Sequence, residues 1–210
     1  GKPIEELERE LGIHDSVKLA SNEHPVGPSA RVLEAIRGCV GDVHLYPDGA
    51  SFDLRARLAK RLGVDPSQLV FGNGSSEVLE LLAKTLLRTG DRVVYPWPSF
   101  AMYPLVVQGM GAEGVAVALN ADLEHDLPAM LGAIDSSTKM VFICNPNNPT
   151  GASIGAAAFD EFMENVPPDV IVAVDEAYVE FALRDDFPDV LGWVARRPAT
   201  IMLRTFSKVY

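Results

Sequence analysis

From residue 69 onward, short apolar runs alternate with longer stretches whose apolar residues recur every three or four positions. The short runs predict strands at Leu69-Val70-Phe71 and around residues 92–95, 115–119, 139–144, 170–174 and 200–203. The longer stretches predict amphipathic helices around residues 78–87, 100–108, 127–134, 156–165 and 190–195. Apolar strands alternating with helices are typical of an α/β fold, with a largely parallel sheet flanked by helices.

The first 68 residues show a different pattern, with helices but no regular alternation. A charged helix is predicted within residues 1–14, a loop rich in proline and glycine at 20–28, and a helix from Ser29, which can cap it, to Val40. Tyr46-Pro47-Asp48-Gly49 predicts a turn, and a further amphipathic helix follows from Phe52 to Leu62. We therefore expect an N-terminal arm and helix at residues 1–45 and a large domain at residues 46–210.

Composition excludes several classes of function. The chain of 210 residues carries a formal net charge of −11, which disfavours binding to nucleic acids and to anionic membranes. The uncharged stretch between Arg92 and Glu113 contains three prolines and two glycines, so it does not read as a membrane span. Two isolated cysteines and four scattered histidines form no disulfide framework and no metal-ligand spacing. We expect a cytoplasmic protein without a metal site.

Polar clusters fall at the predicted carboxyl ends of four strands. They are residues 72–76, residues 145–151, Asp175-Glu176 and residues 205–208. Ligands of open α/β sheets bind at this edge, so the four clusters predict one site.

Each cluster also has a simpler interpretation. Gly72-Asn73-Gly74-Ser75-Ser76 is either a capped βα turn or an anion site at a helix N-terminus. Residues 145–151 are either an ordinary loop or a segment that two prolines hold in a fixed direction. Lys208 is either a solvated lysine after a strand or an amine held as a nucleophile. Asp175 ends an apolar run, where a carboxylate normally needs a cationic partner.

Together, an anion cradle, a buried carboxylate, an asparagine, a tyrosine and an imine-forming lysine match the needs of pyridoxal phosphate. The motifs Asn147-Asn148-Pro149-Thr150-Gly151, Asp175-Glu176-Ala177-Tyr178 and Thr205-Phe206-Ser207-Lys208 resemble those of fold-type I aminotransferases. Leu19-Ala20-Ser21-Asn22-Glu23 and Tyr46-Pro47-Asp48 narrow the resemblance to the histidinol-phosphate aminotransferase subgroup. The resemblance extends over the whole chain.

The resemblance implies roles for individual residues. Lys208 forms the imine with pyridoxal 5'-phosphate, Asp175 pairs with the pyridine nitrogen, and Asn148 and Tyr178 bind the cofactor's O3′. Phe100 stacks on the pyridine ring or, alternatively, only packs in the core. The residues implied to contact the cofactor phosphate are Gly74, Ser75, Thr205 and Ser207, and Ser76, where many relatives have an acidic residue, is also expected to bind the cofactor.

The resemblance also implies partners and a reaction. Tyr46 is expected to reach the cofactor phosphate of a partner subunit in a homodimer, although it can equally be a simple turn tyrosine. Asn22 and Gly27 are expected near the substrate. The implied reaction is transamination between L-histidinol phosphate, a small-molecule amino donor, and 2-oxoglutarate, a 2-oxo acid. Aromatic amino-acid transamination and amino-acid-phosphate decarboxylation on the same fold are the alternatives.

The end of the chain departs from the family pattern. Tyr210 follows Lys208 by two residues, whereas the family has an arginine shortly after the lysine and a C-terminal small domain. We therefore expect the first part of an enzyme, without the small domain. A catalytically inert truncated chain is the remaining alternative.

Overall fold

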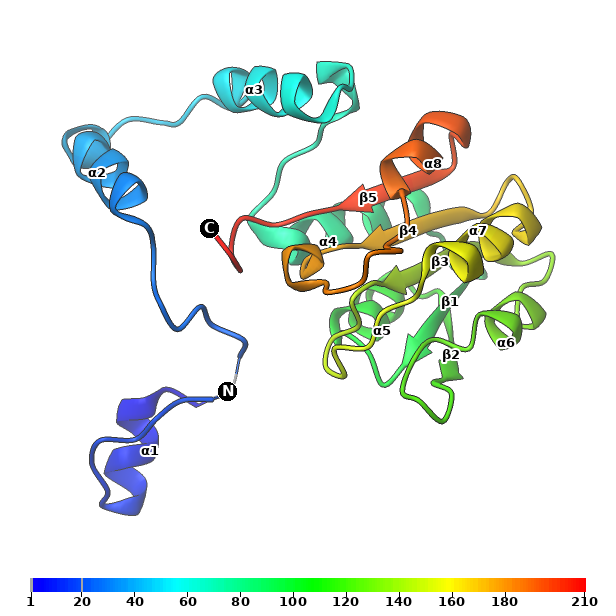
Figure 1. Ribbon diagram of the computed structural model, residues 1–210, viewed down its shortest axis with the longest axis horizontal. Helices are drawn as coiled ribbons and strands as arrows, with labels where there is room; N and C mark the ends of the chain where they lie inside the picture. Colours follow the sequence, from blue (N-terminus) through cyan, green and yellow to red (C-terminus); the bar gives the residue numbers. More distant parts are fainter. Residues whose placement is uncertain (1, 20) are drawn as a thin grey trace. The chain divides into compact units, whose positions relative to one another are not determined.

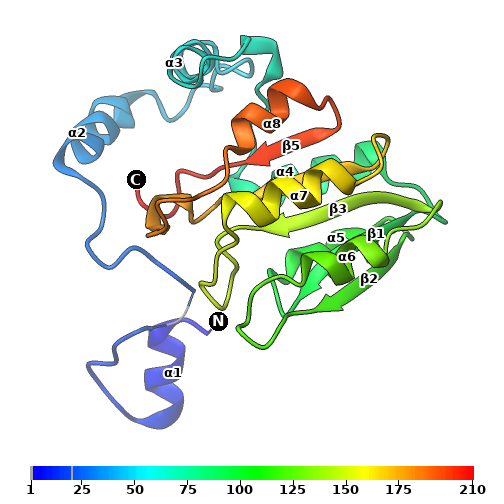
Figure 2. The same cartoon turned by 45° about the vertical axis from the view of Figure 1, so that its right-hand side comes forward.

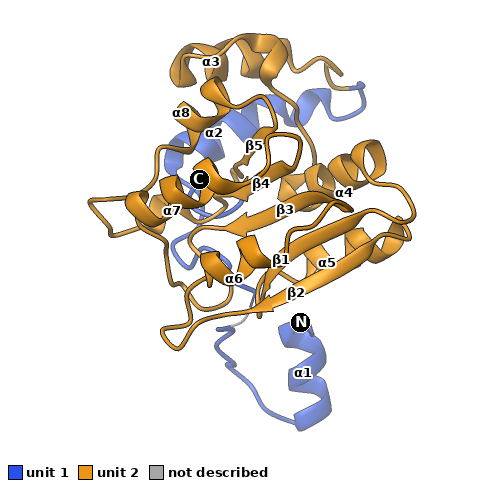
Figure 3. Cartoon of the chain, turned by 90° about the vertical axis from the view of Figure 1, so that its right-hand side faces the viewer, with its two compact units in different colours: residues 1–46, 207–210 blue, residues 47–206 orange. Residues whose placement is uncertain are grey.

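The computed structural model describes residues 2–19 and 21–210 and divides into two compact units (Figure 3). The first comprises Gly1–Tyr46 and Ser207–Tyr210, and the second comprises Pro47–Phe206. Because the two units are separate bodies, each is described by itself.

The first unit contains the helices α1 (Ile4–Leu11) and α2 (Ala30–Cys39) and the 3-10 helix η1 (Val40–Asp42). Ser29 is the N-cap of α2, as predicted, because its side chain accepts a hydrogen bond of 3.3 Å from the backbone N–H of Val32. Gly12 ends α1 in the left-handed conformation.

The second unit is built on a five-stranded sheet (Figure 1). Its strands are β1 (Arg92–Trp97), β2 (Glu113–Ala118), β3 (Thr138–Cys144), β4 (Ile171–Asp175) and β5 (Thr200–Leu203). The order is β2-β1-β3-β4-β5, and every neighbouring pair is parallel. Its helices are α3 (Phe52–Leu62), η2 (Pro66–Gln68), α4 (Gly74–Leu86), α5 (Met102–Gly109), α6 (Leu127–Gly132), α7 (Ala156–Asn165), η3 (Val179–Phe181) and α8 (Val190–Arg196). The predicted parallel α/β sheet is confirmed.

Alternation along the strands divides the core into two layers, one on each face of the sheet. In β3, Val141 and Ile143 pack with residues of α6, α7 and α8, whereas Met140 and Phe142 pack with residues of α4 and α5. Figure 2 shows α6 and α7 on the near face of the sheet and α4 and α5 on the far face. Because both faces are covered, the strands are apolar along their length, which explains the continuous runs in the sequence.

The predicted strand at Leu69-Val70-Phe71 is wrong. These residues have no regular secondary structure, and the side chain of Val70 is 68% exposed. A guanidinium N–H of Arg55 instead binds the Leu69 carbonyl, and the Arg55 guanidinium lies 5.0 Å from the centroid of the Phe71 ring. The segment therefore runs outside the five-stranded sheet. Its residues favour a β conformation, but no neighbouring strand of the described chain pairs with them.

Hydropathy gives no membrane span among the described residues, since none of their helices combines the length and apolar character that crossing a bilayer requires.

Candidate functional site

Asp175 is the last residue of β4 and is 2% exposed. Its neighbours alternate between the two layers: Ala173 packs with α4 and α5, and Val174 packs with α6 to α8. Alternation therefore directs Asp175 toward the α4 and α5 side of the sheet. The phenol of Tyr103 in α5 donates to its Oδ2 at 3.1 Å, and the backbone N–H of Ala177 donates to its Oδ1 at 3.1 Å.

The surroundings of Asp175 favour its uncharged form. Burial raises the pKa of Asp175 to about 6, and the hydrogen bonds from Ala177 and Tyr103 offset only part of that effect. No ion pair to Asp175 occurs in the part of the chain that the structure describes. A buried carboxylate of this kind is set up to hold a cation supplied by a ligand.

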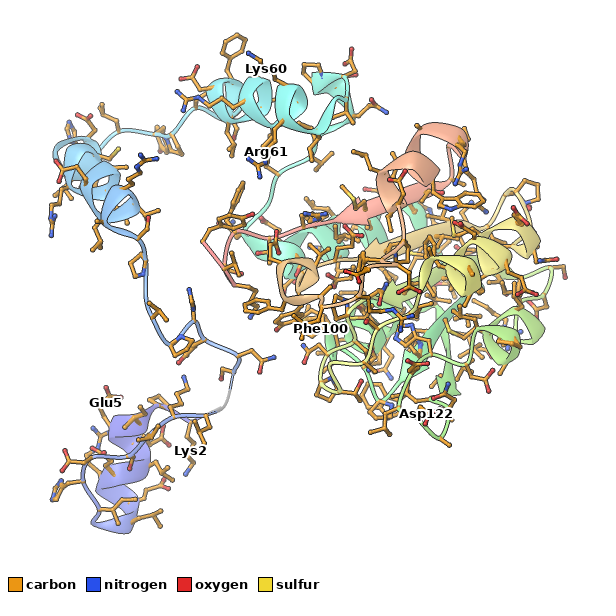
Figure 4. All side chains as sticks on the ribbon, viewed as in Figure 1. Lys2, Glu5, Lys60, Arg61, Phe100 and Asp122 are labelled. Carbon is orange, nitrogen blue, oxygen red and sulfur yellow. The ribbon has the colours of Figure 1, made fainter. Side chains whose placement is uncertain are left out.

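Tyr103 links Asp175 to the predicted stacking residue Phe100. Its ring lies 5.8 Å from the Phe100 ring at 90°, edge to face, and it stacks on Phe142 at 4.7 Å. Burial and the charge of Asp175 raise the pKa of Tyr103, so the phenol keeps its proton and acts as the donor. Phe100 is half-buried, and Figure 4 shows it at the edge of the second unit toward which β5 points.

The loop at residues 145–151 leaves β3 beside Asp175, since the backbone N–H of Asn145 donates to the Asp175 carbonyl at 2.9 Å. Asn147 is 3% exposed and holds the loop from inside. Its amide nitrogen donates to the carbonyl of Pro98 at 3.2 Å and to Oγ1 of Thr150 at 3.0 Å. Its Oδ1 accepts from Ser99 at 2.7 Å. These bonds favour the second interpretation of the loop, a segment held in a fixed direction.

Asn148 and Tyr178 flank Asp175 along the chain. Asn148 is half-buried and follows the fixed Asn147. Tyr178 is half-buried, three residues after Asp175, and its ring lies 6.4 Å from that of Phe181. Thr205, also half-buried, is the second residue after β5, whose Leu203 pairs with Asp175. The carboxyl ends of β3, β4 and β5 thus bring Asn148, Tyr178 and Thr205 to the edge that holds Asp175.

The predicted anion cradle begins α4 rather than following a strand, because residues 69–71 form none. Gly74 has φ +70°, which suits glycine, and Ser75 and Ser76 lie in the first turn of α4. Asn73 is the N-cap of α4, but its side chain makes no capping hydrogen bond; its backbone N–H and its amide nitrogen instead donate to Oε2 of Glu77, at 2.5 Å and 3.0 Å. In Figure 1, α4 begins at the edge where β5 ends. The first-turn N–H groups and the helix dipole therefore face a place where an anion is favoured.

Five of the predicted residues belong to the first unit, so the geometry around Asp175 does not include them. They are Asn22, Gly27, Tyr46, Ser207 and Lys208. Their roles stay predictions.

The site residues contain no metal centre. Within residues 2–19 and 21–210, no group of three or more histidine, cysteine, aspartate or glutamate side chains is arranged to hold a metal ion.

Residues 14–210 match the family model described as aminotransferase class I and II. The chain belongs to this aminotransferase family. It is 50% identical over 212 residues to histidinol-phosphate aminotransferase 2 of Pseudomonas aeruginosa, a match that covers all of this chain and 57% of that protein. It is 46% identical over 211 residues to histidinol-phosphate aminotransferase of Moorella thermoacetica, covering all of this chain and 54% of that protein.

Among solved structures, the aminotransferase fold is matched by histidinol-phosphate aminotransferase from Sinorhizobium meliloti in complex with pyridoxal 5'-phosphate. The TM-score is 0.90 at 31% identity, and the match covers all of this chain and 57% of that chain. The chain thus spans little more than half the length of the aminotransferases it resembles.

Tyr103 is a site residue that the sequence analysis missed. It lies three positions after Phe100, a spacing that would put both side chains on one face of the helix predicted around residues 100–108, although α5 begins only at Met102 in the structure. Combined with the alternation that directs Asp175 toward α5, this spacing is the signal that could have found it.

Proposed function

We propose that the whole protein transfers an amino group between L-histidinol phosphate and 2-oxoglutarate with pyridoxal 5'-phosphate as cofactor. The observation that carries the proposal is the burial of Asp175, which is 2% exposed. Its carboxylate forms no ion pair with any described residue and accepts hydrogen bonds from the Tyr103 phenol and the Ala177 backbone N–H. A protonated pyridine nitrogen is a cation that fits such a carboxylate. The family membership and the 50% identical relative give the same reaction class.

When bound, the cofactor supplies an electron sink for the charge that develops at the substrate carbon. Asp175 would keep the ring nitrogen protonated, because a buried carboxylate and a pyridinium neutralise each other's charge. Asn148 and Tyr178 donate hydrogen bonds to the ring oxygen. Phe100 covers one ring face, with its own orientation supported by the edge of Tyr103.

The anion end of the site uses a different set of side chains. The first turn of α4 offers N–H groups and positive dipole to a phosphate, and hydroxyl groups from the β5 end complete the cradle. The residues assigned to it are Gly74, Ser75, Ser76, Thr205 and Ser207. Glu77 does not compete with this anion for the first-turn N–H groups, since its carboxylate already accepts hydrogen bonds from Asn73.

Lys208 is the proposed nucleophile. Its Nζ would attack the cofactor's aldehyde carbon, whose oxygen leaves as water, and once the substrate's amino group has displaced the lysine, the free amine would take up and return the proton of the reacting carbon. Attack on the cofactor and removal of the proton require the neutral amine, whereas return of the proton requires the ammonium form.

The proposal also covers the assembly. Residues 46–210 serve as the cofactor-binding domain, residues 1–45 as an arm, and Asn22 and Gly27 face the substrate. Tyr46, whose side chain is fully exposed, reaches the phosphate bound by a partner subunit in a homodimer. Both cysteines are free thiols, which fits a cytoplasmic enzyme.

Borohydride reduction of the cofactor-loaded protein tests the cofactor assignment. Peptide mapping is expected to find the label on Lys208, while Lys208→Ala abolishes labelling and Lys84→Ala, at an exposed lysine of α4, leaves it unchanged. Label on another lysine, or none, would contradict the proposal.

Turnover of the whole protein tests the substrate. We expect transamination of histidinol phosphate to exceed that of phenylalanine in kcat/KM. The reverse order would make it an aromatic aminotransferase, and release of carbon dioxide from an amino-acid phosphate would make it a decarboxylase.

A further inference from the structure

The guanidinium of Arg204 lies between two carboxylates at the end of β5. Its Nε donates to Oε2 of Glu176 at 2.8 Å, and its Nη1 lies 3.5 Å from Oε1 of Glu180. The Glu176 side chain is only 3% exposed, whereas that of Arg204 is 44% exposed. Burying a carboxylate this deeply costs free energy unless a cation compensates its charge, and the Arg204 guanidinium is that cation for Glu176.

This ion pair continues the sheet beyond its last paired residues. The β4–β5 ladder ends at Asp175 and Leu203, and the backbone N–H of Glu176 then donates to the Leu203 carbonyl at 3.0 Å. Arg204 follows Leu203 directly, so the side-chain contact ties the two strands together one step further along. Burial raises the pKa of Glu176, and the charge and hydrogen bond of Arg204 oppose that rise.

The Arg204–Glu176 ion pair is adjacent in sequence to residues proposed to act on the cofactor. Asp175 immediately precedes Glu176, and Thr205 immediately follows Arg204. Lys208 is four residues beyond Arg204, and four extended residues span at most about 14 Å, so the position of Arg204 limits the positions that Lys208 can reach. Fixing the position of Arg204 therefore reduces the number of conformations in which Lys208 can reach the site.

We propose that Arg204 and Glu176 are positioning residues for the segment from Thr205 to Lys208. The inference rests on the proposed function, because it assumes that Lys208 acts on the cofactor. Arginine suits this task because its fork contacts two carboxylates at once, one from the end of β4 and one from η3, and so resists rotation. Lysine would supply the charge at a single point and would leave the segment freer to turn.

The chain offers a matched control at the opposite end of the sheet. Arg92, the first residue of β1, also bridges two carboxylates, since its Nε lies 3.2 Å from Oε1 of Glu113 and its Nη1 contacts Asp135. Replacing Arg92 removes a comparable three-charge cluster at the amino end of the strands. If Arg204→Ala acted only by lowering the overall stability of the fold, Arg92→Ala would have the same effect.

The test compares Arg204→Ala, Arg204→Lys and Arg92→Ala in the whole protein. Hydrogen exchange without cofactor is expected to show faster exchange of the amides at residues 205–208 in Arg204→Ala, with no change there in Arg92→Ala. With cofactor, Arg204→Ala is expected to lower both the rate of covalent capture by Lys208 and kcat by about 10- to 100-fold. Arg204→Lys falls between wild type and Arg204→Ala.

Two outcomes would overturn the inference. One is that Arg204→Ala keeps the amide-exchange rates at residues 205–208, the rate of cofactor capture and kcat within about twofold of wild type. The other is equal losses in Arg204→Ala and Arg92→Ala. Failure of the wild type to capture cofactor at Lys208 would instead overturn the proposed function, and hydrogen exchange would still decide whether Arg204 orders the segment.

Discussion

The phenol of Tyr103 donates a hydrogen bond of 3.1 Å to the carboxylate of Asp175, across 72 positions of sequence. The contact follows from the positions of the two residues in β4 and α5. Alternation along β4 directs Asp175 toward α5, and Tyr103 is the second residue of α5. One buried phenol thus supports both the residue proposed to hold the pyridine nitrogen and the residue proposed to cover the ring.

Tyr103→Phe removes the hydroxyl and keeps the ring stacked on Phe142. Asp175 then loses one of its two donors, so its charged form becomes less favourable and its pKa rises further. We expect weaker cofactor binding, together with a loss of about 1–2 kcal/mol in the free energy of unfolding at pH 8. Urea denaturation and cofactor titration measure the two effects.

Tyr95→Phe is the control for that variant. Tyr95 is a buried tyrosine in β1, within the same apolar layer, and its ring lies against Gly114. We expect cofactor affinity to stay at the wild-type value. Equal loss of affinity in Tyr95→Phe and Tyr103→Phe would show that the contact with Asp175 is not the cause.

Two adjacent asparagines are expected to differ in what they do. Asn147→Ala removes the donors to Pro98 and Thr150 and leaves the buried Ser99 hydroxyl without its acceptor, so the free energy of unfolding should fall by about 1–3 kcal/mol. Asn148→Ala is the matched variant at a half-buried position and should change stability by less than about 0.5 kcal/mol while weakening cofactor binding. Urea denaturation of the cofactor-free protein separates the two. A reversed order would contradict the assignment of Asn148 to the cofactor.

Much of the second unit was predictable from the sequence, because fully covered parallel strands must be apolar throughout. The strand at 139–144 follows from that rule and the helix at 156–165 from its three- to four-residue apolar period, and the structure has them at Thr138–Cys144 and Ala156–Asn165. The rule failed at Leu69-Val70-Phe71, where an apolar run lies outside the sheet. Local composition cannot tell a strand from an extended connection, since pairing depends on residues far away in sequence.

For the site, the sequence identified side chains but not their partners. The position of Asp175 after an apolar run already indicated its burial, and the structure agrees at 2% exposed. Its contact with Tyr103 and the contact of Glu176 with Arg204 join separate elements, so only the register of the strands reveals them.

Asp175→Asn should stabilise the cofactor-free protein at neutral pH. The folded-state pKa of about 6 lies above the ordinary value of 3.8, so the stability contributed by Asp175 is fully present below pH 4 and is lost as the pH rises through 6. The loss amounts to about 3 kcal/mol. Unfolding free energies of variant and wild type, compared at pH 4.5 and pH 8, should show a clearly larger gain at pH 8.

Asp126→Asn is the control for the Asp175 variant. Asp126 is the N-cap of α6, and asparagine caps a helix as well as aspartate does. We expect it to keep the wild-type difference between pH 4.5 and pH 8. If Asp175→Asn keeps that difference as well, the carboxylate does not titrate as its burial implies.

His125 should give the opposite pH dependence. It is 5% exposed, it lies in a short bridge with Leu119, and neither ring nitrogen has a hydrogen-bond partner among the described residues. Burial lowers the pKa of His125 to about 4 from 6.5. Because the folded-state value is depressed, the stability it contributes is present above pH 6.5 and is lost as the pH falls toward 4.

His125→Leu removes this titration from a site that offers no hydrogen bond to replace. Relative to wild type, we expect the variant to gain up to about 3 kcal/mol in the free energy of unfolding as the pH falls from 7 to 4. His44→Gln, at an exposed histidine, should follow the wild type throughout. Over the same interval protonation of Asp175 stabilises the wild type, so the two buried groups oppose each other and only the single variants reveal them. A His125→Leu curve parallel to that of the wild type between pH 4 and 7 would mean that this imidazole is not kept neutral by the fold.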